Sequence, residues 1–195
     1  EGNILQSGQW NSKEIPVGNN FTLGEVAAPL TTVTTPQRLI LEVSVNNRKN
    51  DWNIWVYPTV RQAIPHENKI CMTDRLDTIT LNTLEKGATV LLSLKKGSLS
   101  KKLGGDIQIG FSSIFWNTAW TAKQAPHTLG ILCNPAHPAL SEFPTEYHSD
   151  YQWWDAMSHS GAIEFSKLSP KIHPIVRVID DWFTNRPLAL LFEAR

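Results

Sequence analysis

The order strand–helix–strand between residues 69 and 94 constrains the fold of this chain more than any other feature. Residues 69–73 (KICMT) are typical of a short apolar strand, and residues 89–94 (TVLLSL) form a continuous apolar run of the kind that is buried on both faces. Asp74 is a suitable N-cap for a helix between them, and Gly87 is a suitable stop. The helix itself is predicted from one stripe of apolar side chains, Leu76, Ile79 and Leu84. This order implies a right-handed crossover between parallel strands.

Later segments extend this pattern towards the C-terminus. A helix is expected near residues 147–159. Strands are expected in three apolar runs, residues 128–133, 175–179 and 188–192. We therefore predict an α/β fold, in which a mostly parallel, flavodoxin-like sheet carries helices on its faces.

The first part of the chain has a different pattern. Residues 38–45 (RLILEVSV) and 52–57 (WNIWVY) are typical strands on either side of a polar turn, so they predict a hairpin. A hairpin of this size needs something to pack on. We expect a β-rich segment over residues 1–60, part of a β-sandwich, and an α/β domain over residues 61–195. Because the chain ends at Arg195 directly after a predicted strand, this domain is expected to be truncated at its C-terminus.

Charge and hydropathy exclude several classes of partner. The formal net charge of the chain is zero, so no electrostatic footprint for nucleic acid or an anionic membrane is visible in the composition. No apolar run approaches the roughly 20 residues that span a bilayer. We therefore expect neither a nucleic-acid partner nor membrane insertion.

Residues 115–155 are the natural place to look for function. They hold four of the eight tryptophans and three of the six histidines, interleaved with acidic residues and prolines. Rigid aromatic faces mixed with hydrogen-bonding groups suit a concave site for a polar ligand. The residues predicted to line such a surface, or an interface with another domain, are Trp116, Asn117, Trp120, His127, His137, Glu146, His148 and Trp153. Core packing is the alternative role for most of these tryptophans, including one of the pair Trp153 and Trp154.

None of the candidate catalytic sets has a suitable arrangement. Asp180 and Asp181 are neighbours, so in a strand their carboxyl groups point to opposite faces and do not form an acid–base pair. The histidines match no compact metal motif. Cys133 lacks the flanking glycines of a nucleophile elbow, and both it and Cys71 are expected to be unpaired, buried thiols. We predict no catalytic residue, no metal and no cofactor.

Several phrases resemble a known family when taken together. They are NDWNIWVYP, FWNTAW, APHTLGILCNPAHPAL, FPTEYHSDYQWWD and PIVRVIDDW followed by NRPLALLFEAR. Together they resemble the distal, non-catalytic region of bacterial (Bacteroidetes-type) glycoside hydrolases of family 2, the β-galactosidase-like group. The resemblance covers residues 35–195. It implies carbohydrate metabolism in the periplasm, at the cell surface or outside the bacterial cell.

The same resemblance implies that the catalytic domain lies elsewhere. The family's acid–base glutamate follows an asparagine, and no Asn-Glu pair occurs in this chain. The α/β part resembles, more loosely, the class I glutamine-amidotransferase-like layout found as an accessory domain in several glycosidases, but the nucleophilic cysteine of that class is not matched.

The expected function is that of an accessory, non-catalytic module of a glycoside hydrolase. It contributes packing or part of the wall of the sugar site, and its partners are a carbohydrate and other domains of the parent polypeptide. Two alternatives stay open, namely an independent carbohydrate-binding module and a hydrolase with its own unrecognised site.

Overall fold

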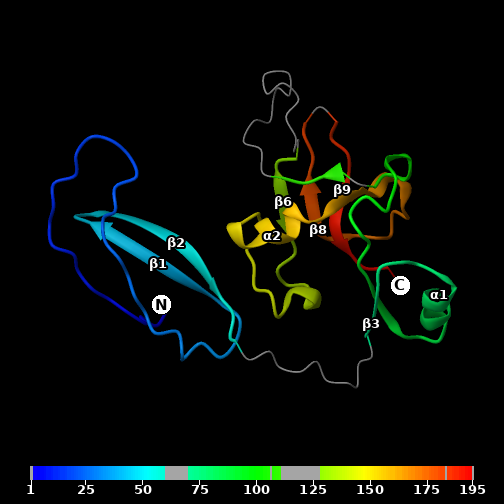
Figure 1. Ribbon diagram of the computed structural model, residues 1–195, viewed down its shortest axis with the longest axis horizontal. Coiled ribbons are helices and arrows are strands. Elements are labelled where there is room, and N and C mark those ends of the chain that lie inside the picture. Colours follow the sequence, from blue (N-terminus) through cyan, green and yellow to red (C-terminus); the bar gives the residue numbers. More distant parts are fainter. Residues whose placement is uncertain (1, 60–69, 106, 111–127, 183, 195) are drawn as a thin grey trace.

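The protein is mostly β, with 29% of its residues in strands and 15% in helices (Figure 1). The computed structural model describes residues 2–59, 70–105, 107–110, 128–182 and 184–194. In these residues the strands form two two-stranded sheets, β1–β2 and β3–β4, and one five-stranded sheet. The flavodoxin-like α/β prediction is therefore wrong.

The five-stranded sheet is antiparallel throughout and curls into a half-barrel. Its strand order is β5-β7-β9-β8-β6. The strands are β5 (Ile107–Gln108), β6 (Gly130–Cys133), β7 (Gly161–Glu164), β8 (Pro174–Ile179) and β9 (Leu188–Phe192). Three of them, β6, β8 and β9, lie where strands were predicted, so the prediction placed these strands correctly but paired them in the wrong direction.

The connection between β8 and β9 explains the antiparallel pairing. Parallel neighbours need a crossover of about a dozen residues or more, usually through a helix. Only residues 180–187 join β8 to β9, and no helix lies among those that the structure describes. The two strands pair from Pro174 opposite Phe192 to Val178 opposite Leu188, with an irregularity near Val176. The short connection therefore requires the chain to reverse direction.

An ion pair and hydrogen bonds to two aspartates hold this connection in place. Asp180 has a side chain that is only 1% exposed, and it forms a two-point ion pair with Arg186. Arg186 Nε donates to Asp180 Oδ2 at 2.7 Å, and Nη2 donates to Oδ1 at 3.0 Å. The Arg186 backbone N–H also donates to Asp180 Oδ2, at 2.9 Å. Asp181 accepts from Thr184 N at 3.0 Å. The carboxylates of Asp180 and Asp181 therefore both stabilise the turn.

The helices are short. In the described residues they are the α-helices α1 (Thr78–Glu85) and α2 (Trp154–Ser158) and the 3₁₀ helices η1 (Lys101–Leu103), η2 (Pro138–Leu140), η3 (Tyr151–Trp153) and η4 (Phe165–Lys167). The helix predicted near residues 147–159 is thus the shorter pair η3 and α2. None of the helices in the described ranges combines the length and apolar character needed to cross a membrane.

The predicted hairpin is confirmed. Strands β1 (Gln37–Val45) and β2 (Arg48–Val56) pair antiparallel, and the turn is tight because Val45 lies opposite Arg48. Asn46 occupies the turn with a positive φ of 55°, a conformation that asparagine tolerates better than most residues. Figure 1 shows the hairpin on one side of the five-stranded sheet, with β3 and α1 on the other.

The predicted strand–helix–strand unit is also present, but as a separate small sheet. Strands β3 (Ile70–Thr73) and β4 (Thr89–Leu92) pair in parallel. Helix α1 ends as expected, because Gly87 has a φ of 80° and donates to Leu84 O while Ala88 N donates to Thr83 O. The N-cap prediction is wrong: Asp77, not Asp74, accepts from Thr80 N, at 2.9 Å.

The predicted apolar stripe of α1 does not face a core in this structure. Ile79 is 77% exposed, and Leu76 and Leu84 are exposed as well, whereas Thr80 is the buried residue of this helix. Asp74 lies outside the helix and pairs with Lys95, with 3.1 Å between Asp74 Oδ2 and Lys95 Nζ. The β3–α1–β4 unit therefore presents apolar side chains on its outer surface.

We expect Ile79→Ser to change the free energy of unfolding by less than about 0.5 kcal/mol, because the side chain is exposed and the two residues have similar helix propensities. The matched core change, Ile131→Ala, removes a fully buried side chain and is expected to cost about 2–5 kcal/mol. Urea unfolding of both variants measures the difference. A loss at Ile79 as large as that at Ile131 would place the stripe in a packed core and contradict the structure.

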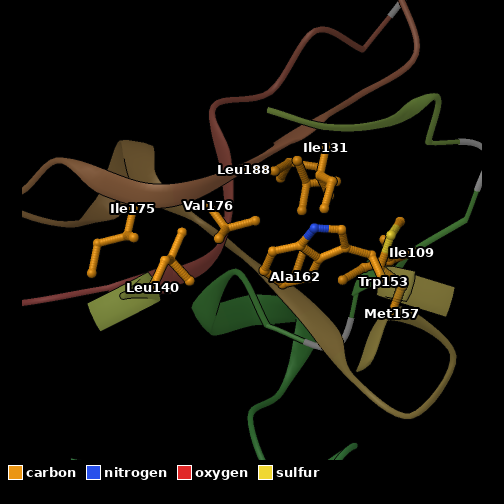
Figure 2. Packing of buried hydrophobic residues seen from close by; sticks show 10 residues of the cluster. Ile109, Ile131, Leu140, Trp153, Met157, Ala162, Ile175, Val176 and Leu188 are labelled. Atoms are coloured by element: carbon orange, nitrogen blue, oxygen red, sulfur yellow. The ribbon is translucent and has the colours of Figure 1, made fainter. Parts of the chain in front are cut away.

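The hydrophobic core lies on one face of the five-stranded sheet (Figure 2). Trp153 and Met157, from η3 and α2, pack over Ile131 of β6, Ala162 of β7 and Leu188 of β9. The remaining buried members are Ile109, Leu140, Ile175, Val176 and Val178. This core fixes η3 and α2, and with them the segment that precedes η3, against the sheet.

Candidate functional site: a groove between the hairpin and residues 143–152

The β1–β2 hairpin contacts residues 143–152 through polar side chains on one face of β2. The Trp55 indole Nε1 donates to Asp150 Oδ2 at 2.8 Å, and Asn53 Nδ2 lies 3.4 Å from the same oxygen. Asp150 Oδ1 accepts from Tyr151 N at 2.6 Å. One carboxylate therefore links the hairpin to the start of η3, and we call this contact region the seam.

Aromatic contacts complete the seam. Tyr57 stacks on Phe143 with ring centroids 5.8 Å apart, and its hydroxyl donates to Gln152 Oε1 at 2.7 Å. Burial raises the pKa of Tyr57 above its ordinary value, which already keeps a phenol protonated at neutral pH. The Trp55 backbone N–H donates to Tyr151 Oη at 3.2 Å. The seam therefore joins aromatic faces through specific hydrogen bonds.

A groove of about 350 Å³ opens along this seam. Its lining residues come from the hairpin, from the loop after β6 and from the loop before η3. They are Arg38, Trp55, Pro135, Pro144, Thr145, Glu146 and Tyr147. Arg38 and Glu146 form an ion pair across the seam, and the Arg38 side chain is still 43% exposed. The groove thus combines an aromatic residue from each side, two prolines, and a pair of charges that remain accessible.

The loop that carries Glu146 is held firmly by the sheet and the core. Cys133 N of β6 donates to Tyr147 O at 2.7 Å, and Leu132 forms an isolated bridge with His148. On the core side, the indole Nε1 of Trp153 donates to Thr145 Oγ1 at 2.8 Å. The groove therefore has a preformed wall.

The predicted site residues have different positions in the described part of the chain. Glu146 lies in the groove, and His148 lies beside it, with its ring edge-on to Tyr147 at 4.9 Å between centroids. His137 caps η2, because its Nδ1 accepts from Ala139 N at 3.2 Å. Trp153 is 5% exposed and belongs to the core. Of the adjacent pair, Trp154 is the exposed tryptophan.

Four other predicted residues, Trp116, Asn117, Trp120 and His127, lie outside the described residues, so their placement at a ligand surface stays a prediction. The groove contains residues that the sequence analysis did not select, above all Arg38, Trp55 and Tyr147. One signal could have found Trp55: Asn53, Trp55 and Tyr57 share a face of β2 that mixes aromatic and polar side chains, as a contact surface does.

The described residues also show the surroundings of the other candidate catalytic and metal-binding side chains. Burial raises the pKa of the Cys133 thiol to about 11, against a weaker opposing hydrogen bond with Thr145, so the reactive thiolate is disfavoured at neutral pH. Asp180 and Asp181 stabilise the β8–β9 turn. In the described ranges, no group of three metal-ligating side chains is close enough to hold an ion.

Family comparisons match two parts of the chain. A family model described as "Domain of unknown function (DUF8487)" matches residues 71–195, which is more than half of the chain. The chain belongs to the DUF8487 family. A second model, described as "Domain of unknown function (DUF8488)", matches residues 1–58. No curated protein is significantly similar to the chain.

The groove is shared between these two regions. Arg38 and Trp55 come from the part that matches DUF8488, and the other lining residues come from the DUF8487 region. Ligand sites occur preferentially where two such units meet. This makes the groove the best-supported candidate site in the described part of the chain.

Proposed function

We propose that this chain is a carbohydrate-binding accessory unit whose sugar site is the groove along the seam. The observation that carries the proposal is the combination, in one groove, of the aromatic residues Trp55 and Tyr147 with the Arg38–Glu146 pair. The apolar face of a pyranose ring stacks on an aromatic ring, and planar charged side chains form hydrogen bonds with its hydroxyl groups. The groove volume of about 350 Å³ suits one or two sugar rings.

The groove residues serve binding rather than hydrolysis in this proposal. Glycoside hydrolysis usually needs two carboxyl groups, one to donate a proton and one to act as base or nucleophile. Glu146 is paired with Arg38, and Asp150 accepts hydrogen bonds from Trp55 and Tyr151. Both carboxylates therefore contact protein donors that hold the seam together.

The parent enzyme follows from the sequence resemblance. A glycoside hydrolase of the β-galactosidase-like group, acting in the periplasm or at the surface of a bacterial cell, would use this unit as part of the wall of its sugar site. The hairpin and the 143–152 loop would then position the sugar next to a catalytic domain of the same polypeptide.

Trp55→Ala is expected to weaken oligosaccharide binding about tenfold or more, because it removes the hairpin's aromatic surface from the groove. Trp55→Phe keeps an aromatic ring but loses the indole hydrogen bond to Asp150, and it is expected to retain most of the affinity. Isothermal titration of the chain with galacto-, gluco- and manno-oligosaccharides measures both effects.

Trp52→Ala is the matched control, because Trp52 lies on the same strand as Trp55 but on the opposite face and outside the groove. It should leave the affinity unchanged. Equal losses in Trp52→Ala and Trp55→Ala, or no binding of any of these sugars by the unmodified chain, would contradict the proposed site.

A further inference from the structure

The charges of the groove limit the chemical class of its ligand. Among the described residues that line the groove, Arg38 is the one basic side chain, and it already faces the carboxylate of Glu146. A second carboxylate, Asp150, accepts a hydrogen bond from the indole of Trp55. Asp150 itself is not among the described lining residues, so an anionic ligand would contact one carboxylate, that of Glu146, and one guanidinium that is already paired.

A neutral hydroxyl group can use both members of the ion pair without breaking it. A guanidinium has five N–H donors, and a carboxylate has about four acceptor positions, so each keeps unused capacity inside a pair. The Arg38 side chain is 43% exposed and that of Glu146 is 26% exposed, which leaves both accessible from the groove. A sugar hydroxyl can accept from Arg38 and donate to Glu146 at the same time.

We infer that the groove selects uncharged pyranosides and discriminates against sugars that carry a carboxylate or a sulfate. This inference rests on the proposed carbohydrate-binding function and adds the charge class of the ligand to it. A uronate could use Arg38 fully only by displacing Glu146, and the displaced carboxylate would remain close to the ligand's own negative charge. The ion pair thus acts as the specificity element, while Trp55 and Tyr147 supply contact area.

The test compares ligands that differ in one group. Neutral gluco- and galacto-oligosaccharides are titrated into the chain in parallel with the same compounds after oxidation of C6 to a carboxylate. The unmodified chain is expected to bind the oxidised series at least tenfold more weakly. Glu146→Gln keeps the side-chain shape but frees the charge of Arg38, so this variant should bind the oxidised series better than the unmodified chain does and the neutral series no better.

Glu142→Gln is the control for the change in net charge, because Glu142 is an exposed acid in the same loop that does not line the groove. It should leave the preference for neutral sugars unchanged. Equal or tighter binding of the oxidised series by the unmodified chain would overturn this inference while the proposed function stood. Absence of binding by both series would overturn the proposed function and the inference with it.

Discussion

Replacing Arg186 by alanine is expected to lower the free energy of unfolding by about 3 kcal/mol or more, because it leaves a buried carboxylate without its partner. Asp180 is 1% exposed at its side chain and receives two hydrogen bonds from the guanidinium of Arg186. Truncating Arg186 removes both, and only backbone donors such as the N–H of residue 186 remain. Urea unfolding followed by tryptophan fluorescence measures the loss.

Arg177→Ala is the matched control, because Arg177 lies on β8 and is exposed. It should change stability by less than about 0.5 kcal/mol. A similar small effect for Arg186→Ala would show that the ion pair does not stabilise the β8–β9 turn.

The effect of Arg186→Ala should depend on pH. Burial raises the pKa of Asp180, but the hydrogen bonds and charge of Arg186 outweigh it and hold this pKa below its ordinary value. A carboxyl group with a lowered pKa stabilises the folded state above its unfolded pKa of about 3.9, and this contribution disappears as the pH falls through the folded value. The stability difference between the unmodified chain and Arg186→Ala should therefore be full at pH 7 and smaller at acidic pH, where the carboxyl group of Asp180 takes up a proton.

Trp153→Ala is expected to destabilise the protein by about 3–5 kcal/mol, because the side chain is buried in the core. Its ring packs edge-on against Phe143 at 4.9 Å between centroids, and its indole holds Thr145 at the wall of the groove. Trp153→Phe keeps most of the packing and loses the indole donor, so a loss of about 1–2 kcal/mol is expected. Thermal and urea unfolding measure both changes.

The exposed Trp52 provides the comparison for this core position. Trp52→Ala is expected to cost less than about 1 kcal/mol, since the residue is 47% exposed. A Trp153→Ala variant with nearly full stability but no sugar binding would contradict a core position and support the predicted role of Trp153 at a ligand surface.

The sequence predicted individual elements better than their arrangement. The hairpin, the β3–α1–β4 unit and the positions of β6, β8 and β9 follow from local apolar patterns. Strand direction does not, because an apolar run such as residues 188–192 suits a buried strand of either orientation. The orientation of β8 and β9 is decided by the length of the connection at residues 180–187, which is too short for a parallel crossover.

The candidate site was predictable only in part, because some of its residues meet through contacts between distant segments of the chain. Glu146 and His148 stand in a run of aromatic and polar residues that indicates a surface. Trp153 belongs to the same run, but its packing depends on which face of η3 meets the sheet. Arg38 is far from Glu146 along the chain, and the two meet only because the hairpin contacts the 143–152 loop. A pattern within one segment carries no information about such a contact.

The most direct test of the groove is a ¹H–¹⁵N spectrum of the labelled chain during titration with a neutral oligosaccharide. Binding in the groove predicts that the indole signal of Trp55 and the backbone signals of residues 145–147 shift together and saturate at one ligand concentration. The indole signal of Trp52, on the other face of the hairpin, should move little. Saturating shifts that leave Trp55 and residues 145–147 unchanged, or the absence of any shift, would contradict a sugar site in this groove.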